Sequence, residues 1–314
     1  MKLLKLIRWQ NLIIIALSLY LVRHFLIEPF YKTQFIQLEM SNIDFAIFVI
    51  TLVLISGAGY IINDIFDVNI DVINKPEKQI IGTQITEDKA YLYYYVMNGI
   101  AVLSALYIGI KNTSFNLGLI LLVPIAVFYF YSLKYKRMFL IGNLAVSFLT
   151  GCLIMIVWIY EFLIIRKNVI AFAEGYNIFW TITYFVIAYS VFAFLITLIR
   201  EFIKDTEDVE GDSKWGCTTL PVVVGVEKSK KAASLLAVFG ILLVAAFQYF
   251  LRNYNMGYYA AVLMIMVQLP FAYLAVIIWR AKDKKDLHYA SNFAKICMLL
   301  GILTMTGVYF SLQP

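Results

Sequence analysis

Residues 43–71 read IDFAIFVITLVLISGAGYIINDIFDVNID, an apolar run that passes directly into a polar and acidic one. A helix that crosses a bilayer needs about 20 predominantly apolar residues, and residues 43–62 meet that requirement. Three aspartates follow within residues 63–71. The stretch therefore predicts a membrane-spanning helix that ends in a cluster of carboxylates.

The composition of the whole chain is that of a membrane protein. Of its 314 residues, 62% are hydrophobic and 15% are charged, whereas soluble domains have about 45–50% and about 25%. This excludes a soluble enzyme, a disordered chain and a disulfide-rich secreted domain. The three cysteines lack the spacing of a zinc site, and we attribute the net charge of +6 to membrane topology, not to nucleic-acid binding. Nine segments are long enough to span a bilayer: 10–27, 43–62, 90–110, 116–133, 140–162, 178–199, 232–251, 257–279 and 290–312.

Lysine and arginine are distributed unevenly between the loops. With a cytoplasmic N-terminus, most of the 26 basic residues lie on the cytoplasmic side, as the positive-inside rule requires. We therefore expect an integral, multi-pass protein of the cell membrane. Its two longest cytoplasmic loops, about 63–89 and 200–231, carry the acidic motifs. No linker divides the sequence, so residues 1–314 are predicted to form a single membrane-embedded domain.

The first acidic segment places polar side chains on one helix face. Asn63, Asp67 and Asp71 are spaced i, i+4, i+8, and Asp64 lies seven residues before Asp71. At 3.6 residues per turn these spacings bring the side chains together. The segment thus predicts an acidic stripe at the end of a spanning helix.

A second acidic segment repeats this pattern at residues 200–212. Glu201, Asp205, Asp208 and Asp212 are spaced i, i+4, i+7, i+11, which predicts a narrower stripe on a helix. Like charges at i,i+4 destabilise a helix by about 0.2–0.5 kcal/mol per pair. A solvated helix end explains one such stripe, but two matched stripes beside the membrane indicate a functional site.

Carboxylates without histidine or cysteine favour a hard cation such as Mg²⁺. Mg²⁺ commonly bridges one or two protein carboxylates to the phosphates of a substrate, so two facing acidic stripes predict a diphosphate held through metal ions. Basic residues in the same loops can together neutralise that group, although each one alone is better explained as a topology signal than as a ligand. These candidates are Arg8, Lys75, Lys78, Lys136, Arg137, Arg200 and Lys204.

These motifs resemble those of the UbiA superfamily of intramembrane prenyltransferases. The family's NDxxDxxxD signature occurs at residues 63–71, and its DxxxD signature at residues 208–212. Lysines at positions 75 and 78 stand where the family has arginines, which keeps the charge but removes bidentate phosphate geometry. The resemblance covers nearly the whole chain. Its further matches are Arg8 with Asn11, Asn74-Lys75-Pro76-Glu77-Lys78, Tyr131-Ser132, Lys136-Arg137 and Gly142-Asn143.

The resemblance implies an all-α fold of nine transmembrane helices around a central cavity open to lipid. It also implies Mg²⁺-dependent transfer of a polyprenyl group from its diphosphate to a lipophilic acceptor. The expected catalytic residues are Asp67, Asp71, Asp208 and Asp212. The expected metal ligands are Asn63, Asp64, Asp67 and Asp71 for one ion and Asp208 and Asp212 for a second, supported by Glu201 and Asp205. The expected diphosphate-binding residues are Arg8, Asn11, Lys75, Lys78, Tyr131, Lys136, Arg137, Arg200 and Lys204. For a general base, Asp71 and Glu201 stay open as alternatives.

The acceptor is suggested by the second motif and the Thr219-Leu220-Pro221 run that follows it. Together they most resemble the archaeal-type ether-lipid branch, which attaches a geranylgeranyl group to geranylgeranylglyceryl phosphate. Other branches prenylate an aromatic ring, haem or chlorophyllide, and this alternative stays open. Two further alternatives are an ion-coupled transporter, which mid-span helix breaks would favour, and a non-catalytic scaffold.

Overall fold

The computed structural model describes residues 2–74, 79–112, 115–254 and 256–312, apart from the side chains of Asn74 and Asn253. The predicted phosphate ligands Lys75 and Lys78 therefore lie outside the described residues. Over the described ranges the protein is helical, and the β-type pairing there is limited to one isolated bridge. The all-α fold class is confirmed.

Nine helical segments of these ranges are long and apolar enough to cross a membrane, and each coincides with a predicted span. In chain order they are α2 (Trp9–Leu21) with η1 (Val22–Ile27) and α3 (Glu28–Thr33); α4 (Asn42–Asn74); α5 (Glu87–Asn112); α6 (Phe115–Ile120) with α7 (Val123–Leu133); α8 (Ile141–Ile165); α9 (Val169–Glu207); α12 (Val226–Leu251); α13 (Gly257–Leu263) with η5 (Met264–Gln268) and α14 (Leu269–Arg280); and α15 (Lys284–Leu303) with α16 (Met305–Ser311). The short helices at their ends are α1 (Lys2–Leu6), η3 (Tyr135–Arg137), α10 (Val209–Lys214), α11 (Leu220–Val224) and η4 (Arg252–Tyr254).

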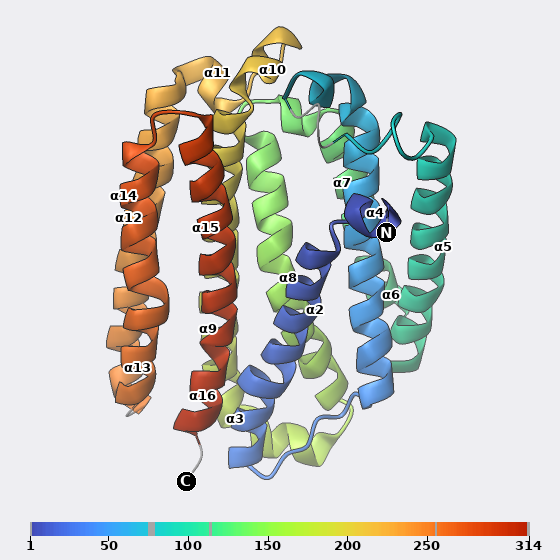
Figure 1. Ribbon diagram of the computed structural model, residues 1–314. Helices are drawn as coiled ribbons and strands as arrows, with labels where there is room; N and C mark the ends of the chain where they lie inside the picture. The colour runs from blue at the N-terminus through green and yellow to red at the C-terminus, as the bar shows by residue number, and fades with distance from the viewer. Residues whose placement is uncertain (1, 75–78, 113–114, 255, 313–314) are drawn as a thin grey trace.

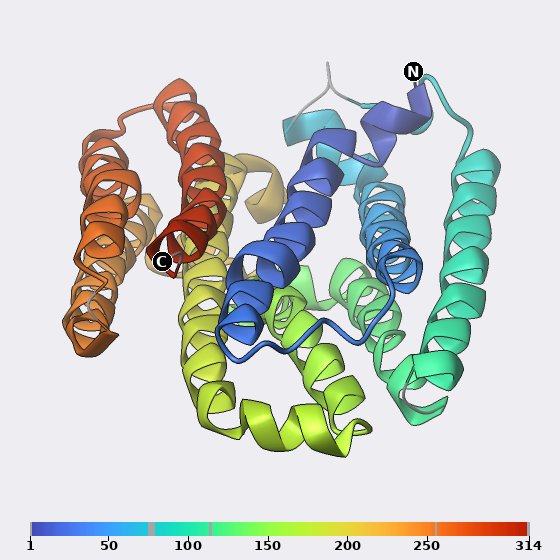
Figure 2. The ribbon, with the colours of Figure 1, turned by 90° about the horizontal axis from the view of Figure 1, so that it is seen from below.

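Six of the spans form a ring. In the order α2, α4, α7, α8, α9 and α15, each helix packs against the next, and α15 returns to α2. Figure 2 shows this ring along the helices, with α5 outside it beside α4 and the α12–α14 hairpin outside it beside α9. The interior of the ring is therefore lined by the six ring helices and not by the peripheral ones.

Prolines follow irregular turns in three of the spans. In the first, the π-helical turn Val22–Ile27 precedes Pro29, and the fourth and eighth spans are broken near a proline as well. The sequence predicted an unbroken fourth span over 116–133, but α6 ends at Ile120 and Pro124 lies in the first turn of α7, where a missing N–H is tolerated. In the eighth span a π-helical turn, Met264–Gln268, precedes Pro270. The wider turn accommodates a residue that cannot donate to the preceding turn. Both breaks are thus local responses to proline.

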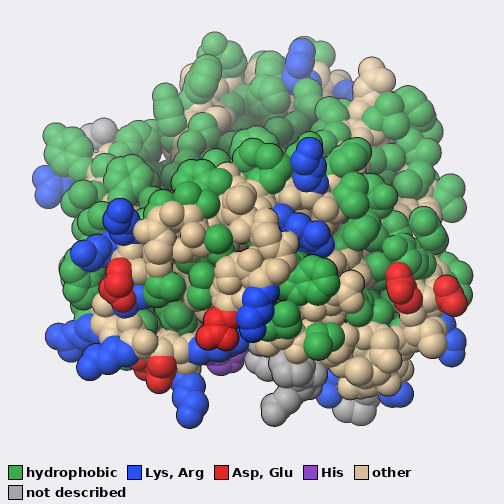
Figure 3. Space-filling view, turned by 90° about the horizontal axis from the view of Figure 1, so that it is seen from above, with side chains coloured by type: hydrophobic (Ala, Val, Ile, Leu, Met, Phe, Trp, Pro, Cys, Tyr) green, Lys and Arg blue, Asp and Glu red, His purple; other side chains and the backbone are tan. Residues whose placement is uncertain are grey.

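At one end of the ring the short helices α10 and α11 lie above the ends of α4 and α9 (Figure 1). Viewed onto this end, the molecule gathers Lys, Arg, Asp and Glu side chains on a face otherwise rich in apolar ones (Figure 3). The acidic segments at the ends of α4 and α9 belong to this charged end.

A separate pair of charges is buried near the opposite end. Arg23 in η1 donates from Nε to Glu161 Oε1 of α8 at 2.6 Å, and the two side chains are 0% and 1% exposed. Arg23 also donates to the Asn42 side chain and the Met40 carbonyl, and its guanidinium lies over the Phe45 ring. This cluster joins η1 to α8 by pairing two opposite charges, as ionisable residues inside a membrane commonly do, while Glu161 Oε2 has no hydrogen-bond partner among the described residues.

Candidate active site

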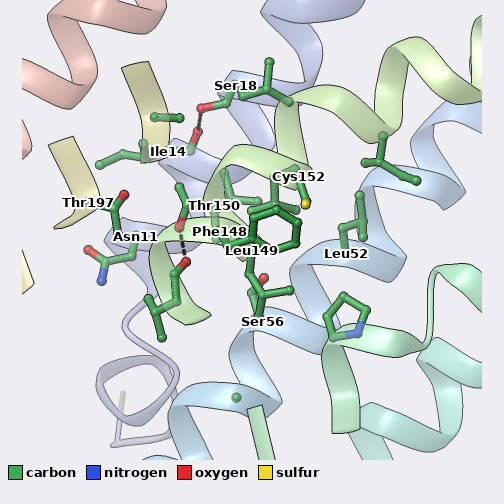
Figure 4. Close-up of a pocket in the computed structure, with 18 of the residues that line it drawn as sticks. Asn11, Ile14, Ser18, Leu52, Ser56, Phe148, Leu149, Thr150, Cys152 and Thr197 are labelled. Carbon is green, nitrogen blue, oxygen red and sulfur yellow. Dashed lines mark hydrogen bonds between the residues drawn. The ribbon is translucent and has the colours of Figure 1, made fainter. Parts of the chain in front are cut away.

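Two adjoining cavities lie inside the ring. The larger, here called the apolar cavity, has a volume of about 480 Å³ and is lined by all six ring helices. Its side chains include Ile14, Leu52, Phe148, Leu149 and Cys152 (Figure 4). The smaller, here called the polar chamber, has a volume of about 140 Å³ and lies among the motif residues. An elongated molecule with a charged head and a hydrocarbon tail fits such a pair of cavities.

One wall of the polar chamber is the end of α4. Asn63, Asp67 and Asp71 all line it, as their spacing predicted. Asn63 Nδ2 donates to Asp67 Oδ2 at 2.9 Å. Asp64 lies to one side, where its Oδ1 accepts from Arg8 Nη2 at 2.7 Å, and it lines neither cavity. The predicted stripe is therefore present, with Asp64 bound to a cation beside it.

The facing wall comes from α9 and the segment after it. Glu201, Asp205, Asp208 and Asp212 all line the chamber, but not from one continuous helix. α9 ends at Glu207, and a new short helix, α10, carries Asp212. Carboxylates at a helix C-terminus are disfavoured by the helix dipole, which gives a physical reason for a break within this acidic run. The two acidic segments nevertheless share one cavity, as the sequence predicted.

Two of the cations that line the chamber come from the turn between α7 and α8. Lys136 forms an ion pair with Asp67 and donates to Asn63 Oδ1 at 3.3 Å. Arg137 donates from Nη2 to the Phe66 carbonyl at 3.3 Å, so it too is fixed against α4. Both side chains line the chamber. These contacts hold two positive charges against the aspartates of α4.

Gly142 allows this turn to approach α8. A Cβ at that position would lie 2.5 Å from the Lys136 Cα and 2.8 Å from the Tyr135 carbonyl oxygen. Side chains do not fit at such distances from backbone atoms. The glycine of the Gly142-Asn143 pair therefore sets the position of Lys136.

Sequence reasoning did not assign a role to two residues that line the chamber. Asn143 Nδ2 donates to Asp205 Oδ2 at 2.8 Å, and Cys217 is buried against the same space. Burial raises the pKa of the Cys217 thiol, as does the Asp212 carboxylate, while Arg137 opposes them. The thiol is therefore protonated at neutral pH. The Gly142-Asn143 match was the available signal for Asn143, whereas no pattern in the sequence marks Cys217.

Arg8 reaches the site from a strained turn between α1 and α2. Its φ of 52° is left-handed, which costs a non-glycine residue about 1–3 kcal/mol. Its guanidinium lies 4.9 Å from the centroid of Tyr60, whose hydroxyl accepts from Asn11 Nδ2 at 3.2 Å. Burial acts to lower the pKa of Arg8, but the charge of Asp64 and its hydrogen bond outweigh burial and raise it. Arg8 is thus a permanent cation held in place by α4.

The two cavities meet at a set of shared residues, here called the junction. These residues, which line both cavities, are Arg8, Asn63, Tyr131, Glu201 and Lys204. Glu201 is the one carboxylate in the described part of the chain that lines the apolar cavity. Two other predicted phosphate ligands, Asn11 and Arg200, line the apolar cavity but not the polar chamber. A reacting atom at the head of a hydrocarbon chain would lie at this junction.

The donor atoms of the chamber fit Mg²⁺ bound together with a phosphate group. Within the described ranges, no three His, Cys, Asp or Glu side chains converge closely enough to hold a metal ion by themselves. The oxygen donors instead lie on two facing walls, with Asp67 and Asp71 on one and Asp208 and Asp212 on the other. Mg²⁺ takes one or two protein carboxylates and completes its shell with water and substrate phosphates. The arrangement therefore suits ions that bridge the walls through a diphosphate, and not a closed protein cage.

Residues 37–299 match the UbiA prenyltransferase family. The chain belongs to this family. It is an intramembrane prenyltransferase, as its motifs predicted, and the transporter and scaffold alternatives give way to that finding.

Curated relatives share most of their length with the chain, and several are named digeranylgeranylglyceryl phosphate synthase. The one from Methanosphaera stadtmanae is 30% identical over 79% of this chain and 82% of its own. The one from Methanothermobacter thermautotrophicus is 29% identical over 85% and 86%, and the one from Thermococcus gammatolerans is 32% identical over 78% and 79%.

Solved structures share the fold. A structure described as that of digeranylgeranylglyceryl phosphate synthase in membranes has a TM-score of 0.63 at 24% identity, covering 98% of both chains. A UbiA homologue from Archaeoglobus fulgidus bound to DMAPP and Mg²⁺ has a TM-score of 0.60 at 15% identity, covering 98% of this chain and 99% of its own. An apo UbiA homologue from Aeropyrum pernix has a TM-score of 0.65 at 15% identity, covering 94% and 97%. These likenesses confirm the UbiA fold.

Proposed function

We propose that this prenyltransferase transfers a geranylgeranyl group from its diphosphate to geranylgeranylglyceryl phosphate. The observation that carries the proposal is the junction, where a chamber with facing carboxylates opens into an apolar cavity. The acceptor is supported by relatives of about 30% identity that are named for this reaction. Both substrates then combine a charged head with a long hydrocarbon chain, as the two cavities do.

The diphosphate is assigned to the polar chamber and the prenyl chain to the apolar cavity. Asp67 and Asp71 would hold one Mg²⁺ with Asn63, and Asp208 and Asp212 a second. Bound Mg²⁺ would stabilise the negative charge that develops on the leaving diphosphate. The fixed cations of the chamber add to this stabilisation because they are already in place when the charge develops. These cations are Arg8, Lys136, Arg137 and Lys204.

The transfer breaks one bond and forms one. The allylic C1–O bond of the donor breaks, and its electron pair leaves with the diphosphate into the chamber. The oxygen of the acceptor hydroxyl forms the new bond to C1, which yields an ether, and its proton must be removed. Tyr131 lines both cavities, so its aromatic ring would lie beside the cationic carbon and could stabilise its charge. The apolar cavity keeps water from that carbon.

We assign Glu201 as the general base that removes the proton from the hydroxyl of the acceptor lipid. Of the two bases that the sequence left open, Asp71 lines only the polar chamber, whereas Glu201 also lines the apolar cavity. Glu201 lies 3.3 Å from Arg200 Nη1 and 3.4 Å from Lys204 Nζ. These cations keep the carboxylate ionised, and therefore able to accept a proton.

The chamber is assigned to the cytoplasmic side because the basic loops lie at that end. Maleimide labelling of Ser213→Cys in α10 and Arg166→Cys at the other end of the ring tests this, since both positions are exposed. In right-side-out vesicles a membrane-impermeant maleimide should label Arg166→Cys alone. Labelling of Ser213→Cys there would reverse the assignment.

The activity itself is tested with the purified chain in lipid nanodiscs. Radiolabelled geranylgeranyl diphosphate is supplied with geranylgeranylglyceryl phosphate or with a hydroxybenzoate or naphthoate acceptor, with Mg²⁺ or with EDTA. We expect Mg²⁺-dependent product with the glyceryl phosphate. Product with an aromatic acceptor alone would overturn the assigned acceptor, and product in EDTA would overturn the role of the metal.

A further inference from the structure

A lysine lies within the last span, far along the helix from the charged loop that precedes it. Lys295 is eleven residues into α15 and lines the apolar cavity together with Met298 and Ile302. Ionisable residues within a membrane span are costly and commonly functional. The reaction assigned above uses Lys295 neither for the metal nor for the leaving diphosphate, because Lys295 does not line the polar chamber.

Two contacts fix the depth of Lys295 relative to the antiparallel helix α9. His288 Nδ1 lies 3.0 Å from Glu207 Oε1, and the ring of Phe192 packs directly on Gly301. Counting along the two helices from either contact brings Lys295 to the level of residues 198–200 of α9. Lys295 therefore lies at about the depth of Arg200.

Arg200 shares two features with Lys295. It also lines the apolar cavity and not the polar chamber. Its Nη1 lies 3.3 Å from Glu201 Oε1, while its buried Nε has no hydrogen-bond partner within the described residues. The guanidinium thus has donor capacity left beside the junction. Two cations from adjacent helices consequently line one level of an otherwise apolar cavity.

A buried hydroxyl lies one turn away. Thr197 is 5% exposed and lines the apolar cavity (Figure 4), yet its Oγ1 has no hydrogen-bond partner in the described part of the structure. By contrast, Thr183 and Thr206 of the same helix each donate to the carbonyl four residues earlier. Thr197 therefore keeps a donor for a ligand in the cavity.

We propose that Lys295, Arg200 and Thr197 form the subsite for the phosphate of the acceptor lipid. The inference rests on the proposed function, which supplies an acceptor with a phosphate monoester. In that acceptor the phosphate is carried by the carbon next to the one that bears the hydroxyl. The subsite must therefore adjoin the proton acceptor, and Arg200 immediately precedes Glu201. The two anionic heads then occupy separate sites, the donor's in the chamber and the acceptor's beside the junction.

Kinetics in nanodiscs with two acceptors test the subsite. Geranylgeranylglyceryl phosphate carries the phosphate, and geranylgeranylglycerol lacks it. A hydrogen bond to a charged group contributes about 1.5–3 kcal/mol, so Lys295→Gln should lower kcat/KM for the phosphorylated acceptor about 10- to 100-fold. The value for the unphosphorylated acceptor and the KM for geranylgeranyl diphosphate should stay the same. Lys295→Arg should restore most of the loss, and Thr197→Val should give a smaller loss of the same kind.

Lys285→Gln is the matched control, since Lys285 is exposed on the same helix and lines neither cavity. An equal loss with both acceptors, or a raised KM for the diphosphate alone, would overturn the subsite and leave the proposed function intact. Equilibrium binding of labelled geranylgeranylglyceryl phosphate, without the prenyl donor, separates the two proposals further. A wild-type chain that turns over only aromatic acceptors overturns the proposed function, whereas a Lys295→Gln chain that binds the phosphorylated lipid as tightly as wild type overturns the subsite alone.

Discussion

The protein buries charges at both ends of its ring of helices, and the two ends differ in what surrounds those charges. Arg23 and Glu161 are almost completely buried and bonded to each other at 2.6 Å, and neither lines a described cavity. At the other end, Asp67 and Lys136 are also paired, but both line the polar chamber, with side chains 16% and 11% exposed. The first pair is closed, whereas the second faces a space that a ligand can enter.

This difference separates a structural role from a chemical one. Breaking a buried ion pair leaves an uncompensated charge and costs stability, whereas charges that line a cavity can be given new partners by a ligand. About 27 Å of α8 separates Asn143 at the chamber from Glu161, at 1.5 Å per residue. Substitutions at the two ends should therefore have opposite signatures, one in turnover and one in stability.

The largest expected effect is on turnover, at the chamber. Asp67→Asn and Asp208→Asn each remove a charge proposed to bind Mg²⁺, so kcat should fall by on the order of 10³-fold, or about 4 kcal/mol. The thermal midpoint in detergent should change little. Near wild-type turnover of either variant in the nanodisc assay would contradict the two-metal site.

At the Arg23–Glu161 pair the main expected effect is on stability and not on turnover. Glu161→Gln leaves Arg23 buried without its counter-charge and should lower the free energy of unfolding by about 3 kcal/mol. At a temperature where the variant is folded, kcat should stay within about twofold of wild type. Unfolding followed by circular dichroism, with turnover measured in parallel, checks both. Arg23→Met combined with Glu161→Leu should recover much of the loss; loss of activity with unchanged stability would reverse the comparison.

Gly142→Ala tests whether the backbone of the turn positions Lys136. The added methyl group must displace the turn, at a cost of about 1–3 kcal/mol, and misplacement of Lys136 should lower kcat about 10- to 100-fold. Gly99→Ala is the matched control, because a Cβ there meets nothing within 4 Å. If the two variants have the same kcat, the close approach of the turn to Gly142 does not position Lys136 for turnover.

A smaller effect is expected where the chamber is held by one neutral hydrogen bond. Asn143→Ala leaves Asp205, which is partly exposed and lines the chamber, without its amide donor, which should cost about 1 kcal/mol and lower kcat by about fivefold. Thr51→Val, in α4, serves as the control, because its buried hydroxyl donates to the Ile47 carbonyl and it lines neither cavity. A wild-type kcat for Asn143→Ala would show that the hydrogen bond to Asp205 does not contribute to turnover.

The smallest effect is expected at Cys217. Its raised pKa means that the reactive thiolate forms only as the pH rises above the ordinary thiol range. Alkylation by iodoacetamide at pH 7 should be slow, and it should accelerate with pH. Cys217→Ser should turn over within about twofold of wild type. Rapid alkylation at pH 7 would show instead that the chamber lowers this pKa.

The sequence predicted those features of the structure that depend on residues close together in the chain. Hydropathy predicted the nine spans, and helical spacing placed Asn63, Asp67 and Asp71 on one wall. Side chains that meet across helices were not predictable in the same way. The diversion of Asp64 to Arg8 depends on a left-handed turn at Arg8, and the end of α9 at Glu207 depends on the balance of charges in an acidic run.

The separation of the predicted phosphate ligands into two cavities could not be predicted from the sequence either, because it depends on how the helices pack. Arg200 and Lys204 are one turn apart on α9, and spacing alone assigns them together. In the fold Lys204 lines both cavities and Arg200 only the apolar one. Cys217 follows α10 without a motif and is held at the chamber by the bond of its N–H to the Asp212 carbonyl, whereas Lys295 comes from α15, which the packing of the ring brings to the apolar cavity.

The left-handed turn at Arg8 ties the position of its guanidinium at the junction to the position of α1. α1 is anchored by Leu6, which is fully buried against Ala58, Ile61 and Ile65 of α4, and this anchor sets where the next residues emerge. A fusion partner or affinity tag that pulls α1 from α4 would release the strain in Arg8 and withdraw its charge from the junction. A group that displaces α1 is thus expected to lower the measured activity.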